Sequence, residues 1–193
     1  MTQTPPPAGR PRNRDTGPAL LAAAHHLVAQ HGYEAVSISQ IIEEAGVSRQ
    51  SLYRRWPTKA DLVLDSFHAM SAPLPPLDPH CPGRKTLELF LTQIFHNLAD
   101  MGSALTALIA AAQTDLQFRA HFVQSFVKPR EELMLEILRH ARTRGEIGGG
   151  CDLQILSDMI HGAFWYRVLN GDPLDEQVVT RLVATVFASA TSG

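Results

Sequence analysis

The sequence predicts an all-α protein with a small N-terminal head and a larger helical body. Apolar residues recur at helical spacing along most of the 193 residues, and no stretch shows the strict alternation expected of a strand. Capping residues, glycines and prolines divide these apolar patterns into short segments. Together these observations predict about nine helices and no sheet.

The first two helices are predicted from the residues at their ends. Leucines and alanines recur at helical spacing over 18–31. Pro18 suits the first turn of this helix, and Gly32 suits its end. The second helix starts at Ser37, which forms a capping box with Gln40, and it ends at Gly46.

The third and fourth helices follow directly. Ser48 suits the N-cap of the third helix, and Pro57 ends it because proline cannot continue the backbone hydrogen bonding. Thr58 and Asp61 match a second capping box, which opens a helix that reaches Met70.

The body is predicted to begin after a proline-rich linker. Residues 71–83 contain five prolines, a composition typical of a semi-rigid connection. Pro129 suits a first helical turn better than a helix interior, so a break is expected just before it. The predicted body helices are 84–101, 103–113, 115–126, 129–144, 153–170 and 175–190.

Charge is distributed unevenly between the two ends of the chain. Residues 1–60 contain seven Lys and Arg against four Asp and Glu, whereas the remainder contains ten against fifteen. An excess of positive charge at one end indicates an N-terminal module that binds a polyanion, although the whole chain has a net charge of −2.

Several other classes of protein find no support in the sequence. Two cysteines do not make a disulfide framework, although one disulfide between Cys81 and Cys151 stays open. The histidines show no metal-ligand spacing, and no motif for an enzyme or a cofactor is present. Without a signal sequence or a membrane-spanning apolar run, a cytoplasmic protein is expected.

The second and third helices are too short to be stable alone, and they are joined tightly around Gly46. This pattern is typical of a helix-turn-helix, whose second helix enters the major groove of DNA. At about 100° per residue, Leu52 and Trp56 share the inner face of the third helix. The outer face then carries Gln50, Ser51, Tyr53 and Arg54. The charges alone would equally suit a solvated helix face, but that interpretation does not account for the caps and the turn.

The segment 37–63, SISQIIEEAGVSRQSLYRRWPTKADLV, resembles the DNA-binding region of the TetR family of bacterial transcriptional regulators. Trp56 stands where that family more often has phenylalanine. The resemblance implies a homodimer with a three-helix DNA-binding head and a helical body that binds a small-molecule effector. The candidate DNA-binding residues are Ser37, Ser48, Arg49, Gln50, Ser51, Tyr53, Arg54, Arg55 and Lys59.

These candidates have different expected roles. Arg49, Gln50 and Ser51 are the residues expected to read bases, a role in which the residues of the family vary with the operator. Tyr53 and Lys59 are expected to contact phosphates. Residues 1–14 form a basic arm that either reaches the minor groove through its arginines or makes no contact with DNA. Residues 15–60 then form the DNA-binding domain, and 61–193 form the effector-binding and dimerisation domain.

In the body, the helices at 153–170 and 175–190 are apolar over wide arcs, and the resemblance places a homodimer interface there. The candidate effector-binding residues are Phe95, His96, Phe122, Phe126, Trp165 and Arg167, although each aromatic also suits an ordinary core position.

The function predicted from the sequence is a homodimeric repressor that a small molecule releases from a palindromic double-stranded DNA operator. Two alternatives remain open: a helical enzyme or carrier without specific DNA binding, and a DNA-binding regulator that lacks an effector or activates transcription.

Overall fold

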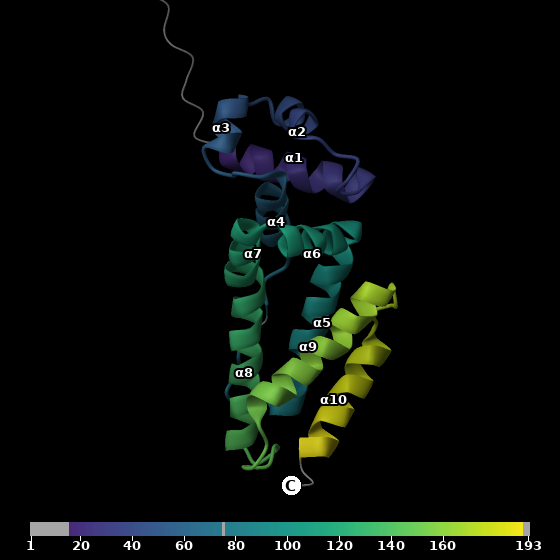
Figure 1. Cartoon of the computed structure of the whole chain (residues 1–193). Helices are drawn as coiled ribbons and strands as arrows, with labels where there is room; N and C mark the ends of the chain where they lie inside the picture. Colours follow the sequence, from purple (N-terminus) through teal and green to yellow (C-terminus); the bar gives the residue numbers. More distant parts are fainter. Residues whose placement is uncertain (1–15, 75, 191–193) are drawn as a thin grey trace, which may run out of the picture.

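The computed structural model describes residues 16–74 and 76–190, with side chains described up to 188. Over these residues the chain contains helices and no strand, as predicted (Figure 1). The α-helices are α1 (Thr16–His31), α2 (Ile38–Ala45), α3 (Arg49–Tyr53), α4 (Lys59–Met70), α5 (Gly83–Met101), α6 (Ser103–Thr114), α7 (Leu116–Phe122), α8 (Lys128–Thr143), α9 (Leu153–Asn170) and α10 (Glu176–Ala190).

Helices α1, α2 and α3 form a head at one end of the molecule, and α4 leads from the head into the body (Figure 1). The predicted caps are confirmed. Ser37 and Gln40 form a capping box at the start of α2, and Thr58 and Asp61 form another at the start of α4. Gly46 ends α2 with a φ of 64°, a left-handed conformation that glycine adopts without steric cost.

The head and the body share one continuous apolar core. In the head, Leu20, Ile41 and Leu52 are fully buried, each from a different helix. Helix α4 packs along α1 on one side and contacts α6 and α7 on the other, and its Leu62 and Val63 have no exposed surface. Since α4 packs against both parts, a movement of the body helices acts directly on the helix that follows α3.

Helices α7 and α8 form one continuous rod (Figure 1), so the predicted break before Pro129 is wrong. A single π turn, η1 (Val123–Val127), connects them, and Pro129 lies in the first turn of α8. Proline at this position lacks an N–H and disfavours regular α-helical bonding to the preceding turn. The wider π turn accommodates it, and the Arg130 guanidinium donates to the Phe126 carbonyl at 2.6 Å.

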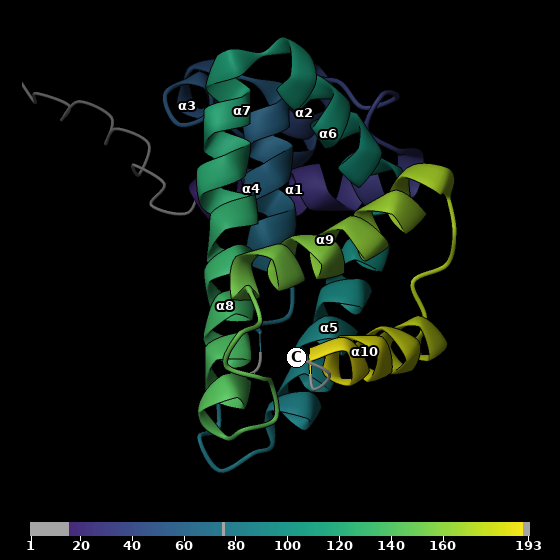
Figure 2. The same ribbon diagram turned by 60° about the horizontal axis from the view of Figure 1, so that its bottom comes forward.

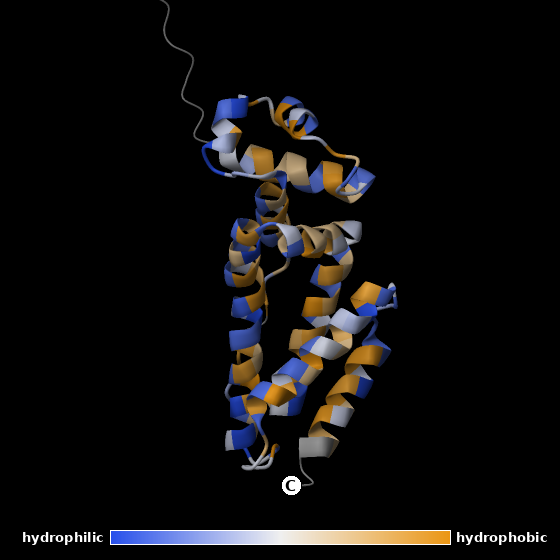
Figure 3. Ribbon diagram, viewed as in Figure 1, coloured by the Kyte–Doolittle hydropathy of each residue, from blue (hydrophilic) through white to orange (hydrophobic). Residues whose placement is uncertain are grey.

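The last two helices close the body. Helix α9 crosses it next to α8, and α10 packs against α5 and also contacts α9 (Figure 2). Hydropathy colouring shows blue residues on the outer end of α3 and mainly apolar residues along α5 and α6 (Figure 3). Among the described helices, no single one is long and apolar enough to cross a membrane, although α5 and α6, bent by 86°, pass that test as a pair. Many of their apolar side chains form the core of the body.

Candidate nucleic-acid interface and ligand cavity

The five-residue helix α3 is held in place at both ends. At its start, the Ser48 hydroxyl accepts a hydrogen bond from the Ser51 N–H at 3.3 Å, and the two hydroxyls lie 3.0 Å apart. At its end, Trp56 is 7% exposed, and its indole N–H donates to Asp65 of α4 at 2.8 Å. The predicted inward positions of Leu52 and Trp56 are therefore confirmed, and Trp56 fixes α3 to α4.

The outer face of α3 is open. Tyr53 is 45% exposed, and Gln50 and Arg54 are exposed beside it. Amide and guanidinium groups can each make paired hydrogen bonds to a base edge, to adenine and to guanine respectively. Ser51 is half-buried because its hydroxyl turns toward Ser48. The face therefore presents three long polar side chains on a rigid, short helix.

Two of the candidate residues also form hydrogen bonds within the head. Arg49 donates to the Ser39 hydroxyl of α2 at 2.8 Å, which bridges α2 and α3. Ser37 exchanges hydrogen bonds with Gln40 within the capping box. Both residues are exposed, so each keeps a polar group near the surface in addition to its structural bond.

Arg55 and Lys59 differ in how freely they can reach a ligand. The Arg55 guanidinium lies against the first turn of α1, where a Cβ added to Gly17 would stand 2.5 Å from its Nη1. Lys59 donates to the carbonyls of Tyr33 and Val36 at 2.8 and 2.9 Å, and its Nζ lies 4.0 Å from the centre of the Tyr33 ring. These two hydrogen bonds hold the ammonium at the α1–α2 loop, and partial burial lowers the pKa of Lys59.

The structure describes the helical part of the head but not the basic arm. Arg10, Arg12 and Arg14 lie outside the described residues, and their predicted contact with the minor groove stays a prediction.

Comparison with known proteins identifies the head and the body together. Residues 20–65 match the family model of bacterial regulatory proteins of the tetR family, and residues 83–186 match the tetracyclin repressor-like C-terminal domain. The chain belongs to the TetR family. It is therefore a DNA-binding transcriptional regulator with a helix-turn-helix head.

Individual TetR-family proteins resemble the chain over most of its length. YdeS, an HTH-type transcriptional regulator of Bacillus subtilis, is 29% identical over 181 residues, which is 93% of this chain and 91% of YdeS. The DNA-binding transcriptional repressor TetR of Mycobacteroides abscessus is 26% identical over 178 residues, 91% of this chain and 94% of that protein. The crystal structure of the TetR-family regulator SCO0332 aligns with a TM-score of 0.74 and 32% identity, covering 91% of this chain and 98% of SCO0332.

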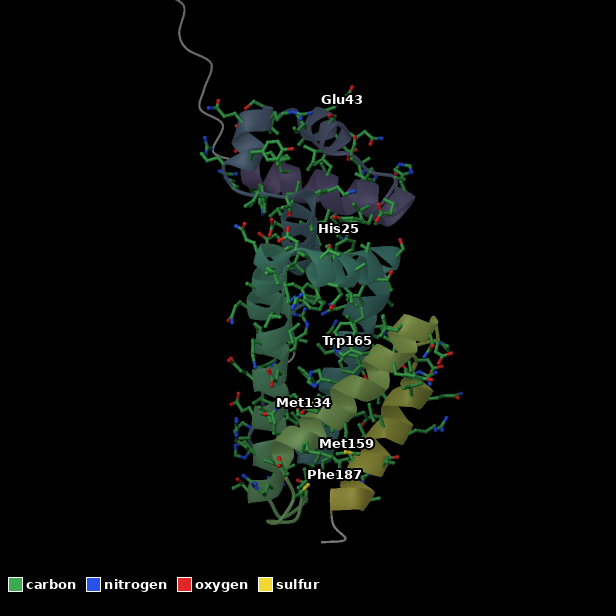
Figure 4. The ribbon with its side chains drawn as sticks, viewed as in Figure 1. His25, Glu43, Met134, Met159, Trp165 and Phe187 are labelled. Atoms are coloured by element: carbon green, nitrogen blue, oxygen red, sulfur yellow. The ribbon has the colours of Figure 1, made fainter. Side chains whose placement is uncertain are left out.

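The body of this TetR-family protein contains an apolar hollow of about 230 Å³. Phe122 and Trp165, two candidate effector-binding residues, line it together with Ile109, Val127 and Leu169. Trp165 lies near the middle of the body on α9 (Figure 4). A second, small cavity of about 10 Å³ shares Val127 and Trp165 with the hollow and is also lined by Phe126. Three of the predicted aromatics are thus brought together.

The two polar residues of the small cavity were not predicted from the sequence. Arg130 of α8 and His161 of α9 line this cavity beside Phe126 and Trp165. The spacing of Phe122, Phe126 and Arg130, each four residues apart, would have placed them near one another on a continuous helix. The predicted break before Pro129 separated Arg130 from the two phenylalanines and hid this signal.

The remaining effector candidates lie elsewhere. Phe95 is 2% exposed and packs edge-on against Phe164 at 5.9 Å, within the core. His96 is exposed on α5 and lines neither cavity. Arg167 donates to the Pro173 carbonyl at 3.0 Å and lines a separate surface hollow between α9 and α10. The two polar effector candidates, His96 and Arg167, are therefore not brought to the aromatic cavity.

A short chain of polar contacts joins the head to the wall of the hollow. His121 of α7 places Nδ1 2.7 Å from the Asp61 carboxylate and Nε2 3.4 Å from the Asp65 carboxylate. Asp65 also accepts the Trp56 hydrogen bond, and Asp61 also caps α4 by accepting from Thr58. Because Phe122 follows His121 directly and lines the hollow, only a few bonds separate the hollow from the end of α3.

One face of α9 is apolar and exposed. Ile155, Met159, Tyr166 and Leu169 are each more than half exposed, with relative exposures of 55%, 61%, 69% and 64%. Their spacing places them along one stripe of the helix, with the exposed Gly162 between them. The opposite side, which includes Leu156 and Ile160, is buried in the body. Sequence reasoning identified the wide apolar arc but did not separate its buried half from its exposed half.

The described part of the chain holds no group of three or more His, Cys, Asp or Glu side chains arranged to bind a metal ion. Cys81 and Cys151, both half-buried, are free thiols.

Proposed function

We propose that this TetR-family regulator is a homodimeric repressor that a small molecule, bound in the body, releases from a palindromic operator. The observation that carries the proposal is the set of contacts from Trp56 through Asp65 to His121. They tie the end of the candidate recognition helix to the helix that lines the apolar hollow. A ligand that binds one position of α7 better than another would shift the equilibrium between two positions of the head by that difference in affinity.

In this proposal α3 lies in the major groove. Gln50 and Arg54 read base edges, and Arg49 and Ser51 contact the neighbouring bases. Tyr53, Ser48 and Ser37 bind phosphates beside the groove, while Arg55 and Lys59 approach the backbone from the start of α1 and of α4. The openness of the outer face of α3 and the rigid anchoring by Trp56 support these roles.

The proposed dimer forms through α9 and α10. The exposed stripe of Ile155, Met159, Tyr166 and Leu169 supports it, because a monomer rarely exposes a continuous apolar patch of this kind. Gly162, in the middle of the stripe, lets two α9 helices approach closely. A twofold axis at this stripe would present two copies of α3 to half-sites about 34–36 Å apart.

DNA binding is tested with an operator found by footprinting the DNA upstream of the protein's own gene. Fluorescence anisotropy then measures the affinity of the wild type, Arg54→Ala and Tyr53→Phe, with Arg142→Ala on the exposed side of α8 as a matched control. We expect Arg54→Ala to weaken specific binding by about 1–3 kcal/mol, because one base or phosphate contact is lost. Unchanged affinity in both head variants would refute the assignment of α3.

The dimer is tested by Met159→Glu, with Leu116→Glu as the control. Both residues are exposed and apolar, at 61% and 73%, but Leu116 lies on α7, away from the stripe. A charge in the centre of an apolar interface is costly to bury, so Met159→Glu should yield monomers in light-scattering chromatography and weaken operator binding. A dimeric Met159→Glu protein would exclude this interface.

A further inference from the structure

The strongest unexplained feature of the body is the charge of Arg130. Arg130 lines the small cavity together with Phe126, Phe164 and Trp165, all of them apolar. Burial among these side chains lowers the pKa of Arg130 to about 10, because the charged form is poorly solvated. A positive charge in such surroundings is unfavourable unless a partner compensates it.

No carboxylate in the described chain fills this role. Arg130 donates to the Phe126 carbonyl at 2.6 Å and lies 3.9 Å from the centre of the Phe126 ring, and among the described residues it takes part in no ion pair. The neighbouring Glu131 is bound instead to Lys128 at 2.6 Å and to Gln154 at 3.0 Å. Because a guanidinium has five N–H donors in a planar fork, Arg130 keeps most of its capacity for an oxyanion.

His161 adds a second polar group to the same cavity. Its Nδ1 lies 2.8 Å from the Ser157 carbonyl, and since a carbonyl only accepts, Nδ1 carries a proton. In the neutral imidazole Nε2 is then a hydrogen-bond acceptor. Arg130 and His161 come from different helices and line one cavity that contains no acidic side chain.

The apolar hollow gives this charged end a matching apolar end. The small cavity, at about 10 Å³, has room for about one water molecule, while the adjoining hollow measures about 230 Å³. Trp165 and Val127 line both spaces. The π turn at Val123–Val127 lies at their boundary, and π turns within helices often occur at functional sites. A rotation of the half-buried Trp165 would join the two spaces into one site.

We propose that this site binds a small amphipathic acid, whose carboxylate pairs with Arg130 and whose apolar chain or ring occupies the hollow beside Phe122 and Trp165. The inference rests on the proposed effector-responsive function and specifies the chemical class of its ligand. Arg130 determines the preference for an anion, and the aromatic walls select an apolar body.

Isothermal titration of the full-length protein with octanoate and with 1-octanol tests the proposal, because the two share an apolar chain and differ in charge. The variants are Arg130→Gln, Arg130→Lys and, as a matched control, Arg139→Gln on the exposed side of α8. We expect the wild type to bind octanoate at least about tenfold more tightly than 1-octanol, since hydrogen bonds to charged groups are strong. Arg130→Gln should lose this preference without losing 1-octanol binding, Arg130→Lys should keep part of it, and Arg139→Gln should match the wild type.

Thermal unfolding shows whether each variant is folded. Arg130→Gln should be no less stable than the wild type, because it removes a poorly compensated charge. Equal affinities of the wild type for octanoate and 1-octanol, unchanged octanoate affinity in Arg130→Gln, or no octanoate binding would each overturn the proposal.

Operator binding separates this inference from the proposed function. Octanoate binding that depends on Arg130 and weakens operator binding supports both. Octanoate binding that depends on Arg130 but leaves operator affinity unchanged supports the ligand site and refutes the effector-responsive function.

Discussion

Replacement of His121 tests whether the contacts between α7 and α4 transmit ligand binding to the DNA-binding head. The Nδ1 of His121 lies 2.7 Å from Oδ1 of Asp61, and its Nε2 lies 3.4 Å from Oδ1 of Asp65. Because an ionised carboxylate only accepts hydrogen bonds, His121 is the donor to Asp61. His121→Leu removes both contacts while keeping a side chain of similar bulk against Phe118.

The structure sets the expected magnitude. The Asp61 side chain is 9% exposed, and a hydrogen bond to a charged group contributes about 1.5–3 kcal/mol. The His121 side chain is 33% exposed, and solvent screening reduces that value to about 1–2 kcal/mol. Asp65 is 38% exposed and farther from the imidazole, so it adds little. An energy of 1–2 kcal/mol corresponds to about a 5–30-fold change in an equilibrium constant.

Urea unfolding of the wild type, His121→Leu, Asp61→Asn and the double variant measures this energy as a double-mutant cycle. We expect an interaction energy of about 1–2 kcal/mol, and His96→Leu, which changes an exposed histidine of α5, should be silent. With a ligand that weakens operator binding by the wild type, His121→Leu should bring the ratio of operator affinities with and without ligand toward one. An interaction energy below about 0.5 kcal/mol, or an unchanged ratio, would refute the reasoning.

Three further substitutions test single contacts. Trp56→Ala should lower the free energy of unfolding by about 3–5 kcal/mol. Trp56→Phe should lower it less, because only the Asp65 hydrogen bond and a little volume are lost, and urea unfolding measures the free energy of unfolding of both variants. Lys59→Gln should weaken operator binding and reduce the salt slope by about one, because the proposed function places Lys59 beside the DNA backbone; an unchanged salt slope would limit Lys59 to its bonds with the Tyr33 and Val36 carbonyls. Glu146→Gln should destabilise the protein by about 1 kcal/mol at neutral pH, because the Glu146 carboxylate accepts from the N–H groups of Gly83 and Arg84 at the start of α5. Glu136→Gln is the exposed control. Burial raises the pKa of Glu146, but the hydrogen bonds from Gly83, Arg84 and Arg144 outweigh burial, so the pKa is lowered overall. The stabilising contribution of Glu146 should therefore be present above pH 4.5 and be lost as the pH falls below that value, as acid titration of the unfolding midpoint would show.

The parts of the fold that the sequence predicts correctly depend on residues close together in the chain. Ser37 with Gln40 and Thr58 with Asp61 are three residues apart, and each pair forms the expected capping box. The inward direction of Trp56 follows from its position one turn after Leu52, which needs only the helical repeat. Local signals of this kind are sufficient to identify the helix-turn-helix.

The parts that were missed depend on contacts between distant segments. Lys59 finds its carbonyl partner on Tyr33, 26 residues away, and His121 finds Asp61 at a separation of 60 residues. The position of Arg130 depends on the π turn, which no cap or breaker announces, and Pro129 points toward the opposite conclusion. Sequence periodicity identifies a buried face but does not tell which residue of another helix will meet it.

The location of His121 explains why α7 is a better candidate than α4 alone for the first step of coupling. Helix α4 follows α3 directly, yet it is also packed along α1, and Leu62 and Val63 are fully buried. Helix α7 ends at the π turn, where the backbone departs from α-helical bonding, and Phe122 at that end lines the hollow. A ligand that displaces Phe122 therefore also moves His121, which holds the Asp61 cap of α4 and the Asp65 carboxylate that binds Trp56. Because binding free energies are reciprocal, operator DNA that fixes Trp56 must disfavour the same displacement of Phe122 and weaken ligand binding by an equal factor.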